Sequence, residues 1–372
     1  MSVSEPGAFW RRNTPPRRLS VFDEAIGGGY YQPMQAILVR ETGGPAVMRP
    51  EALEAPAAAE GQALVRVHTA GVNYIDTYHR SGLYPKEPPF IPGLEGAGVI
   101  EAIGPSAGGT EVAAAGAATE ALRPGERVAW TDIPGSYAEY VIAPVNRLVR
   151  VPAGLRLEQA AAAMLQGMTA HYLSRDTAPI REGSRILVHA AAGGVGLLLT
   201  QMAKRRGAYV YGTVSTPEKA ALAEEAGCDR IINYREEDFA EVIRRENPEG
   251  IDTVYDSVGR DTLARSMDCL RRRGMLVSFG QSSGAVEPID PRVFSQKGSL
   301  FFTRPSLMDY VVRDEELYRR AEDVFEWLGS GELALRIGET WPLLEAQRAH
   351  ERLEGRLTTG KVLLQVGESR DG

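Results

Sequence analysis

A glycine-rich turn between an apolar strand and an apolar helix constrains this chain more than any other stretch. Residues 185–190 form a short apolar run that is typical of a buried parallel strand. The turn AAGGVG follows at 191–196, and an apolar helical stretch begins at Leu197. In this context Gly193 would let backbone N–H groups approach a pyrophosphate, and Gly196 would let the helix pack against the strand. The pattern predicts a dinucleotide-binding unit; a turn whose glycines serve packing only is the alternative.

The residues after the next strand indicate which dinucleotide the chain prefers. An NAD site usually has Asp or Glu about 20 residues beyond the glycines, where it binds the ribose hydroxyls. Here the strand over 208–214 is followed by Ser215 and Thr216, and Lys219 lies one turn into the next helix. Hydroxyls and a lysine suit a 2′-phosphate, so we predict NADP(H). Glu218 is the counter-argument, although it should fall within the helix.

Composition sets the class of protein. A length of 372 residues, 43% hydrophobic residues and 24% charged residues suit a soluble globular chain of two or three domains. The net charge of -7 argues against a general nucleic-acid surface. The two cysteines, Cys228 and Cys269, are too few for a disulfide framework, and no apolar run is long enough to span a membrane. We therefore expect a reducing, cytoplasmic setting.

The chain divides into four stretches by their patterns. Residues 1–33 are rich in Arg, Pro and Gly and read as a disordered extension, an upstream start or, less readily, a transit peptide. Residues 34–160 alternate short strands with turns, which predicts an antiparallel, partly barrel-like domain. Residues 161–305 alternate strands with helices, which predicts a doubly wound parallel Rossmann sheet. Residues 306–372 hold an amphipathic helix and a closing strand and are expected to return to the first domain.

Several stretches outside the glycine turn resemble the zinc-free branch of the medium-chain dehydrogenases/reductases, and specifically bacterial NADPH:quinone oxidoreductases related to zeta-crystallin. The resemblance implies an α/β fold in which a GroES-like catalytic domain accompanies the Rossmann domain. An Ala/Gly-rich loop over 105–121 and the extension over 1–33 depart from the family pattern. The resembling stretches are 71–78, 80–84, 189–196, 232–238, 254–260, 277–280 and 303–306.

Zinc enzymes of this superfamily carry ligands that this chain lacks. Asn73 stands where they have a cysteine, and Leu94 stands where they have the histidine of a Gly-His-Glu motif. Leucine cannot bind zinc and a carboxamide binds it poorly. The five histidines show no metal-binding spacing, and His189, at the end of a strand, reads as a packed, hydrogen-bonded residue. We therefore expect no metal site.

The resemblance implies that Asn73, Tyr78 and Tyr84 line the space over the nicotinamide. An amide and two phenols can hydrogen-bond a quinone oxygen as charge develops there, and Tyr78 or water could supply the proton. Half-buried packing is the alternative for both tyrosines. Asp76 reads as a loop-ordering residue more readily than as a base.

The resemblance also implies a set of cofactor contacts. For two of these residues another role is possible: Arg304 could form a structural salt bridge, and Lys361 could be a solvated lysine at a strand edge. The expected contacts to NADPH are Thr169, Gly193, Gly194, Val195, Ser215, Lys219, Tyr234, Ser257, Phe279, Arg304 and Lys361.

Three functions compete. The first is zinc-independent reduction of quinones by NADPH. The second is reduction of enones or alkenals on the same fold, because an enone and a quinone are electronically alike. The third is a nucleotide- or RNA-binding, crystallin-like protein, against which the acidic composition counts. The expected partners are an electron-poor small molecule and a second copy of the chain. The resemblance implies that the apolar strand over 300–302 is the dimer edge, although a core strand would look the same.

Overall fold

The computed structural model describes residues 33–105 and 121–367. The expected extension over 1–33 therefore lies outside the described residues except for Pro33, and so does nearly all of the Ala/Gly-rich loop. No helix among the described residues is both long and apolar enough to cross a membrane.

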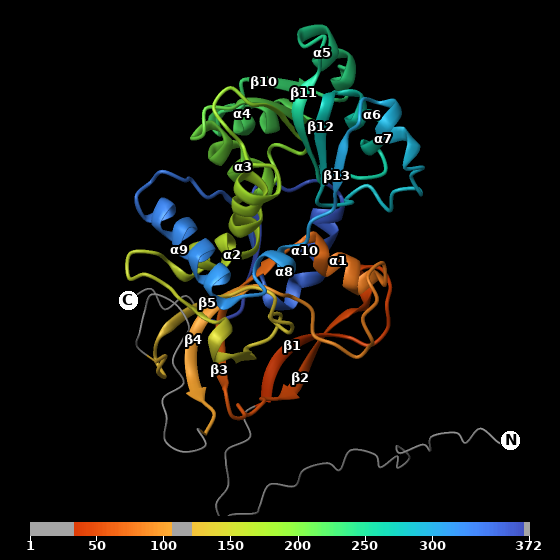
Figure 1. The fold of residues 1–372 in the computed structure, drawn as a ribbon. Helices are drawn as coiled ribbons and strands as arrows, with labels where there is room; N and C mark the ends of the chain where they lie inside the picture. The colour runs from red at the N-terminus through yellow and green to blue at the C-terminus, as the bar shows by residue number, and fades with distance from the viewer. Residues whose placement is uncertain (1–32, 106–120, 368–372) are drawn as a thin grey trace, which may run out of the picture. The chain divides into compact units, whose positions relative to one another are not determined.

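Six parallel strands form the sheet that the glycine pattern predicted (Figure 1). Their order is β10-β9-β8-β11-β12-β13, and every pair is parallel. The order runs outward in both directions from β8 and β11, so a crevice opens at the carboxyl ends of these two strands. The strands are β8 (Arg185–Val188), β9 (Tyr209–Val214), β10 (Arg230–Asn233), β11 (Ile251–Asp256), β12 (Leu270–Ser278) and β13 (Phe301–Thr303).

Helices connect these strands, and their starts follow local capping rules. The helix α4 begins at Pro217, and its N-cap Thr216 accepts a hydrogen bond from the Lys219 backbone N–H. Asp238 caps α5 in the same way. The helices of this part are α3 (Gly194–Lys204), α4 (Pro217–Glu225), α5 (Phe239–Glu246), α6 (Leu263–Asp268) and α7 (Arg292–Gln296).

The second large sheet is mixed and mainly antiparallel, in the order β14-β15-β3-β4-β5-β7, with β6 paired to β3. A two-stranded sheet of β1 (Pro33–Val39) and β2 (Met48–Glu54) accompanies it. Sequence-distant strands meet here, because β15 pairs with β3 through Val362 and Val72. The strands are β3 (Gln62–Val72), β4 (Gly96–Ile103), β5 (Arg127–Trp130), β6 (Tyr140–Pro144), β7 (Val149–Arg150), β14 (Ile337–Pro342) and β15 (Lys361–Gln365).

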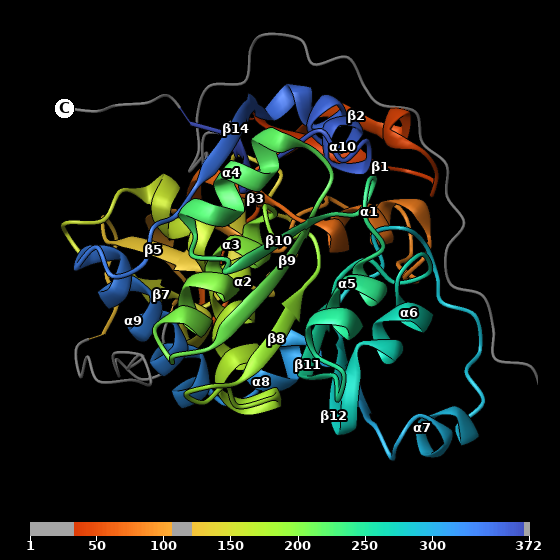
Figure 2. The same cartoon turned by 90° about the horizontal axis from the view of Figure 1, so that it is seen from above.

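The helix α2 (Leu157–Tyr172) joins the two parts. Its small, buried residues pack against α3 and against β3, β4 and β5. Figures 1 and 2 show α2 and α3 beside one another between the sheets. The remaining helices are α1 (Tyr74–Ser81), α8 (Leu307–Tyr310), α9 (Asp314–Gly329) and α10 (Ala346–Glu354). The predicted boundary at 160 falls within α2. The boundaries at 160 and 305 both stay predictions.

Candidate active site

A cavity of about 760 Å³ opens where the carboxyl ends of the parallel strands face the mixed sheet. Thirteen of the fourteen predicted site residues line it, and Lys361 is the exception. Those thirteen are Asn73, Tyr78, Tyr84, Thr169, Gly193, Gly194, Val195, Ser215, Lys219, Tyr234, Ser257, Phe279 and Arg304. The structure therefore gathers residues from both parts of the chain around one space; their individual roles stay predictions.

The glycine turn lines this cavity from Ala192 to Gly196. Gly193 is the N-cap of α3 and offers no side chain to cap the first turn, so the first N–H groups of the helix are left for another acceptor. A Cβ on Gly196 would lie 2.4 Å from the Ala190 carbonyl oxygen and 2.8 Å from that of Ala191. Only glycine lets the helix approach the strand this closely.

One end of the cavity is polar and partly open. Ser215 is nearly buried there, whereas Tyr234 is 43% exposed. The Lys219 ammonium donates to the Arg356 carbonyl oxygen at 2.7 Å, and burial lowers the pKa of Lys219. The Arg356 guanidinium lies 3.5 Å from the Asp261 carboxylate. Two cations thus stand at the end where the sequence predicts a 2′-phosphate.

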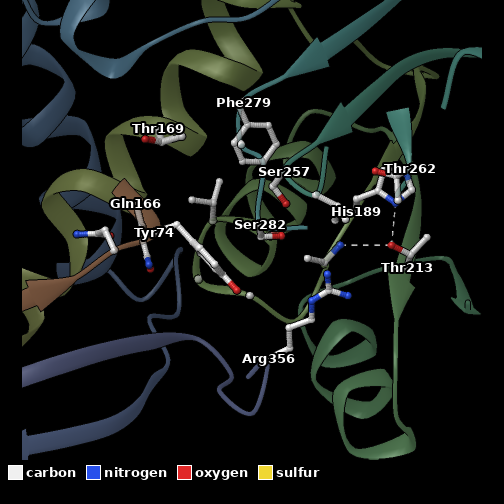
Figure 3. Close-up of a pocket in the computed structure, with 18 of the residues that line it drawn as sticks. Tyr74, Gln166, Thr169, His189, Thr213, Ser257, Thr262, Phe279, Ser282 and Arg356 are labelled. Atoms are coloured by element: carbon white, nitrogen blue, oxygen red, sulfur yellow. Dashed lines mark hydrogen bonds between the residues drawn. The ribbon is translucent and has the colours of Figure 1, made fainter. Parts of the chain in front are cut away.

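Sequence reasoning missed Arg356. Its position just before the last strand carries no local signal. The pairing of β15 with β3, the Tyr74 hydroxyl on the Leu353 carbonyl oxygen and the ion pair between Arg80 and Glu354 bring this segment back to the cavity. Figure 3 shows Arg356 on the same side of the cavity as His189 and Thr213, with Gln166 and Thr169 on the opposite side. Other lining residues outside the prediction include Tyr74, Gln166, Thr262, Ser282 and Met308.

A second group of lining residues, which we call the other end of the cavity, contains the two predicted tyrosines. The Tyr78 hydroxyl accepts a hydrogen bond from the Gln281 backbone N–H at 3.1 Å, and the Tyr84 hydroxyl accepts one from the Arg304 guanidinium at 2.9 Å. Their ring centroids are 5.1 Å apart. Burial raises the pKa of Tyr78 far above its ordinary value of 10.0. Tyr78 therefore stays protonated at neutral pH and has its own O–H free to donate.

Arg304 lines the cavity and donates several hydrogen bonds. Besides Tyr84, its guanidinium donates to the Ser278 hydroxyl at 3.1 Å and to the Gln281 side-chain oxygen at 3.2 Å. No carboxylate among residues 33–105 and 121–367 forms an ion pair with it. The structural salt bridge considered as an alternative is therefore absent from the described residues.

Lys361 lies beneath the cavity and is 0% exposed, so the alternative of a solvated lysine is wrong. Its ammonium donates to the Asn73 side-chain oxygen at 2.8 Å and pairs with the Glu95 carboxylate. The Asn73 amide nitrogen donates to the same carboxylate at 2.8 Å. The other Glu95 oxygen accepts from the Leu165 backbone N–H at 2.5 Å. A buried pair of charges thus supports the side chain of Asn73.

Asp76 does not line the cavity. Its Oδ2 accepts from the Asn73 backbone N–H at 2.8 Å and from the Tyr137 hydroxyl at 3.0 Å, while its Oδ1 has no hydrogen-bond partner. Burial raises the pKa of Asp76 from 3.8 to about 7. These bonds fix the first turn of α1, which agrees with a loop-ordering residue.

His189 lines the cavity but is fully engaged. Its ring nitrogens lie 3.0 Å from the Thr213 and Ser266 hydroxyls, and the first of these bonds is drawn in Figure 3. Burial lowers the pKa of His189, so the ring is neutral. Among the residues that the structure describes, no three His, Cys, Asp or Glu side chains cluster in a way that could hold a metal ion.

Comparisons with known proteins agree with this geometry. Residues 59–153 match the alcohol dehydrogenase GroES-like domain, and residues 194–327 match the zinc-binding dehydrogenase family. Quinone oxidoreductase 1 of Escherichia coli is 42% identical over 87% of this chain and 96% of its own. A 2-haloacrylate reductase of a Burkholderia species is 40% identical over 89% of this chain and 98% of its own.

Solved structures of similar proteins match this fold over most of the chain. A mycobacterial protein solved with NADPH has a TM-score of 0.84 and 43% identity, over 89% of this chain and 99% of its own. The Escherichia coli quinone oxidoreductase solved with NADPH has a TM-score of 0.83 and 41% identity, with the same coverage. These matches confirm the predicted Rossmann and GroES-like fold. The chain belongs to the quinone oxidoreductase branch of the medium-chain dehydrogenases/reductases.

Proposed function

We propose that this protein is an NADPH:quinone oxidoreductase that binds its acceptor without a protein-held metal. The observation that carries the proposal is one cavity with two unlike ends: cations and a glycine turn at one, an amide and two phenols at the other. The overall reaction takes one quinone, one NADPH and one proton to one hydroquinone and one NADP⁺.

The residues at the cationic end fit a phosphorylated dinucleotide. The uncapped N-terminus of α3 and the backbone of Gly193, Gly194 and Val195 suit the pyrophosphate. Lys219, Arg356 and the Ser215 hydroxyl suit a 2′-phosphate. The other proposed contacts to the cofactor are Thr169, Tyr234, Ser257, Phe279 and Arg304. Lys361 is fully buried and bonds Asn73, so we propose that it does not contact the cofactor directly.

An orphaned polar atom also points to a ligand. The Gln166 side-chain oxygen is buried without a hydrogen-bond partner among the described residues, and Gln166 lines the cavity above Gly194. A buried acceptor is unfavourable unless something donates to it. A bound ligand that carries an amide N–H would satisfy it.

At the other end the chain binds and orients the acceptor. When bound, NADPH supplies the hydride, which carries two electrons and one hydrogen nucleus. We propose that the free O–H of Tyr78 and the amide of Asn73, which both line the cavity, donate hydrogen bonds to the acceptor's oxygen as negative charge develops there. Since the pKa of Tyr78 is raised, we propose that water supplies the final proton.

Reduction of an activated carbon–carbon double bond is the second candidate. It is favoured by the similarity to the 2-haloacrylate reductase, which is matched over 89% of this chain, against 87% for quinone oxidoreductase 1 of Escherichia coli. Hydride delivery to an enone needs the same two donors near the carbonyl or carboxylate oxygen, so both acceptors suit the same geometry.

Steady-state rates with matched acceptors test the proposal. NADPH oxidation is followed with 1,4-benzoquinone, a naphthoquinone, an unsubstituted enone and 2-chloroacrylate, each at several concentrations. We expect kcat/KM for the quinones to exceed that for the others by about a hundredfold or more, which corresponds to about 2.8 kcal/mol. Faster reduction of the enone or haloacrylate would replace the proposal with the second candidate.

We also propose that the protein is a cytoplasmic homodimer. Support for the dimer comes from β13, the last strand of the parallel sheet, where Phe301 and Phe302 are 56% and 39% exposed. Exposed apolar side chains on an edge strand favour pairing with a second copy. Light scattering with size-exclusion chromatography tests this: Phe301→Lys should shift a dimer to a monomer.

A further inference from the structure

The carboxamide of Asn73 is held by a buried ion pair. Lys361 and Glu95 are both 0% exposed, and each bonds one end of the Asn73 side chain. The ammonium can only donate and the carboxylate can only accept, so the amide has one possible orientation. Its oxygen faces Lys361 and its nitrogen faces Glu95.

One donor of Asn73 remains after these bonds are counted. The amide nitrogen carries two hydrogens, and one of them is used by Glu95. Asn73 lines the cavity, and no further side-chain bond joins its nitrogen to the described residues. The second N–H is therefore the polar group that Asn73 can offer to a molecule in the cavity.

The fold is built to accommodate this pair. A Cβ on Gly71 would lie 2.1 Å from a Glu95 carboxylate oxygen and 2.8 Å from the Lys361 ammonium. Any larger residue at position 71 would therefore clash with the ion pair. Leu165, on α2, donates its backbone N–H to the other Glu95 oxygen. Burying two charges is expensive and is not in itself a source of stability. Stability therefore does not explain why the pair lies against a cavity-lining amide, and a functional role does.

We propose that Lys361 and Glu95 are positioning residues that hold Asn73 as a hydrogen-bond donor to the acceptor's oxygen. The ammonium on the amide oxygen draws electron density from the amide and strengthens the remaining N–H as a donor. That donor matters most when hydride transfer places negative charge on the acceptor's oxygen, before a proton from water neutralises it. This inference deepens the proposed function and rests on it.

The proposal makes a specific prediction for Lys361→Met. The amide then loses its fixed orientation, so kcat with 1,4-benzoquinone should fall about tenfold, less than the loss of a whole oxyanion donor. The Kd for NADPH, measured by its fluorescence without acceptor, should change less than twofold. A purely structural role would not separate kcat from NADPH binding in this way.

A double-mutant cycle shows whether Lys361 acts through Asn73. In the Asn73→Ala background, Lys361→Met should have no further effect on kcat, because the amide that it positions is already gone. Glu95→Gln provides a second variant that keeps the side-chain shape, and its effect should vanish in the same background. Lys361→Arg should recover part of the lost kcat, since a cation again faces the amide oxygen.

A matched control removes a lysine from an ion pair elsewhere. Lys204 bonds Asp229 and the Ala208 carbonyl oxygen and does not line the cavity, so Lys204→Met should leave kcat unchanged. The inference is overturned if Lys361→Met keeps the wild-type kcat, or if its effect is equally large with Ala at position 73. A wild-type protein that fails to reduce quinones would instead overturn the proposed function.

Discussion

The two ends of the cavity recognise their ligands by different means. The cationic end uses backbone N–H groups of the glycine turn and partly exposed side chains such as Tyr234. The acceptor end uses buried side chains held by other buried side chains, as Asn73 is held by Lys361 and Glu95. The difference suggests that changes at the first end alter binding, whereas changes at the second alter turnover.

The largest effect should come from Gly196→Ala at the cationic end. The new Cβ would lie 2.4 Å from the Ala190 backbone oxygen, so the turn must shift. We expect the Kd for NADPH to rise about a hundredfold, or about 2.8 kcal/mol. Gly329→Ala is the matched control, because nothing lies within 4 Å of its Cβ position. Unchanged NADPH binding in Gly196→Ala would remove the turn from the cofactor site.

The next largest effect should come from the two cations of that end. Lys219→Ala and Arg356→Ala should each raise the Kd for NADPH about tenfold, or about 1.4 kcal/mol, the range for hydrogen bonds to charged groups. The Kd for NADH should stay nearly constant, because it lacks the 2′-phosphate. Arg235→Ala, an exposed neighbour that does not line the cavity, controls for general charge. Equal losses for both nucleotides would refute the assignment.

Tyr78→Phe tests the acceptor end. Removing the hydroxyl leaves the ring in place but deletes the free O–H, so kcat with a quinone should fall about fivefold, or about 1 kcal/mol. NADPH binding should be unaffected. Tyr209→Phe, at the amino end of β9, is the control. If kcat is unchanged in both variants, Tyr78 serves packing and the alternative considered from the sequence is correct.

We expect that replacing Asp76 changes activity least of all these substitutions but clearly changes the free energy of unfolding. Its pKa is about 7 in the folded protein against an ordinary value of 3.8, so the folded state binds more protons between these pH values. The free energy of unfolding should therefore fall as pH rises from about 4 to about 7. Asp76→Asn keeps both hydrogen bonds to Oδ2 and removes the charge.

Urea denaturation of wild type and Asp76→Asn at pH 5 and pH 8 measures this effect. The stability of the variant relative to wild type should increase by at least about 1.4 kcal/mol between the two pH values, the equivalent of one pKa unit. Other titrating groups cancel in this difference. A difference that is the same at both pH values would mean that Asp76 is charged throughout.

The same contrast explains what the sequence could predict. The strand, the glycine turn and α3 are contiguous, so residues 185–204 carry their own signal, and the predicted fold is confirmed. Thirteen of the fourteen predicted site residues line one cavity. Some of them, such as Ser215 and Ser257, follow the ends of parallel strands that the sheet order places together, whereas Tyr78, Thr169 and Lys219 lie on helices.

The support of the acceptor end could not be predicted in this way. Lys361 and Asn73 are 288 residues apart, and Lys361 and Glu95 are 266 apart. No periodicity links positions so distant, and a lysine at the start of a strand normally suggests a solvated edge. The pairing of β15 between β14 and β3 decides its burial, as it also decides the arrival of Arg356 at the other end.

The most direct test of the central claim is a single turnover of NADPH with excess 1,4-benzoquinone, without oxygen and with EDTA present. The loss of nicotinamide absorbance and the appearance of hydroquinone are followed together. We predict that one hydroquinone forms for each NADPH oxidised, at a rate that EDTA does not change and that NADH does not match at equal concentration. No reaction, or a reaction that EDTA abolishes, would contradict the account.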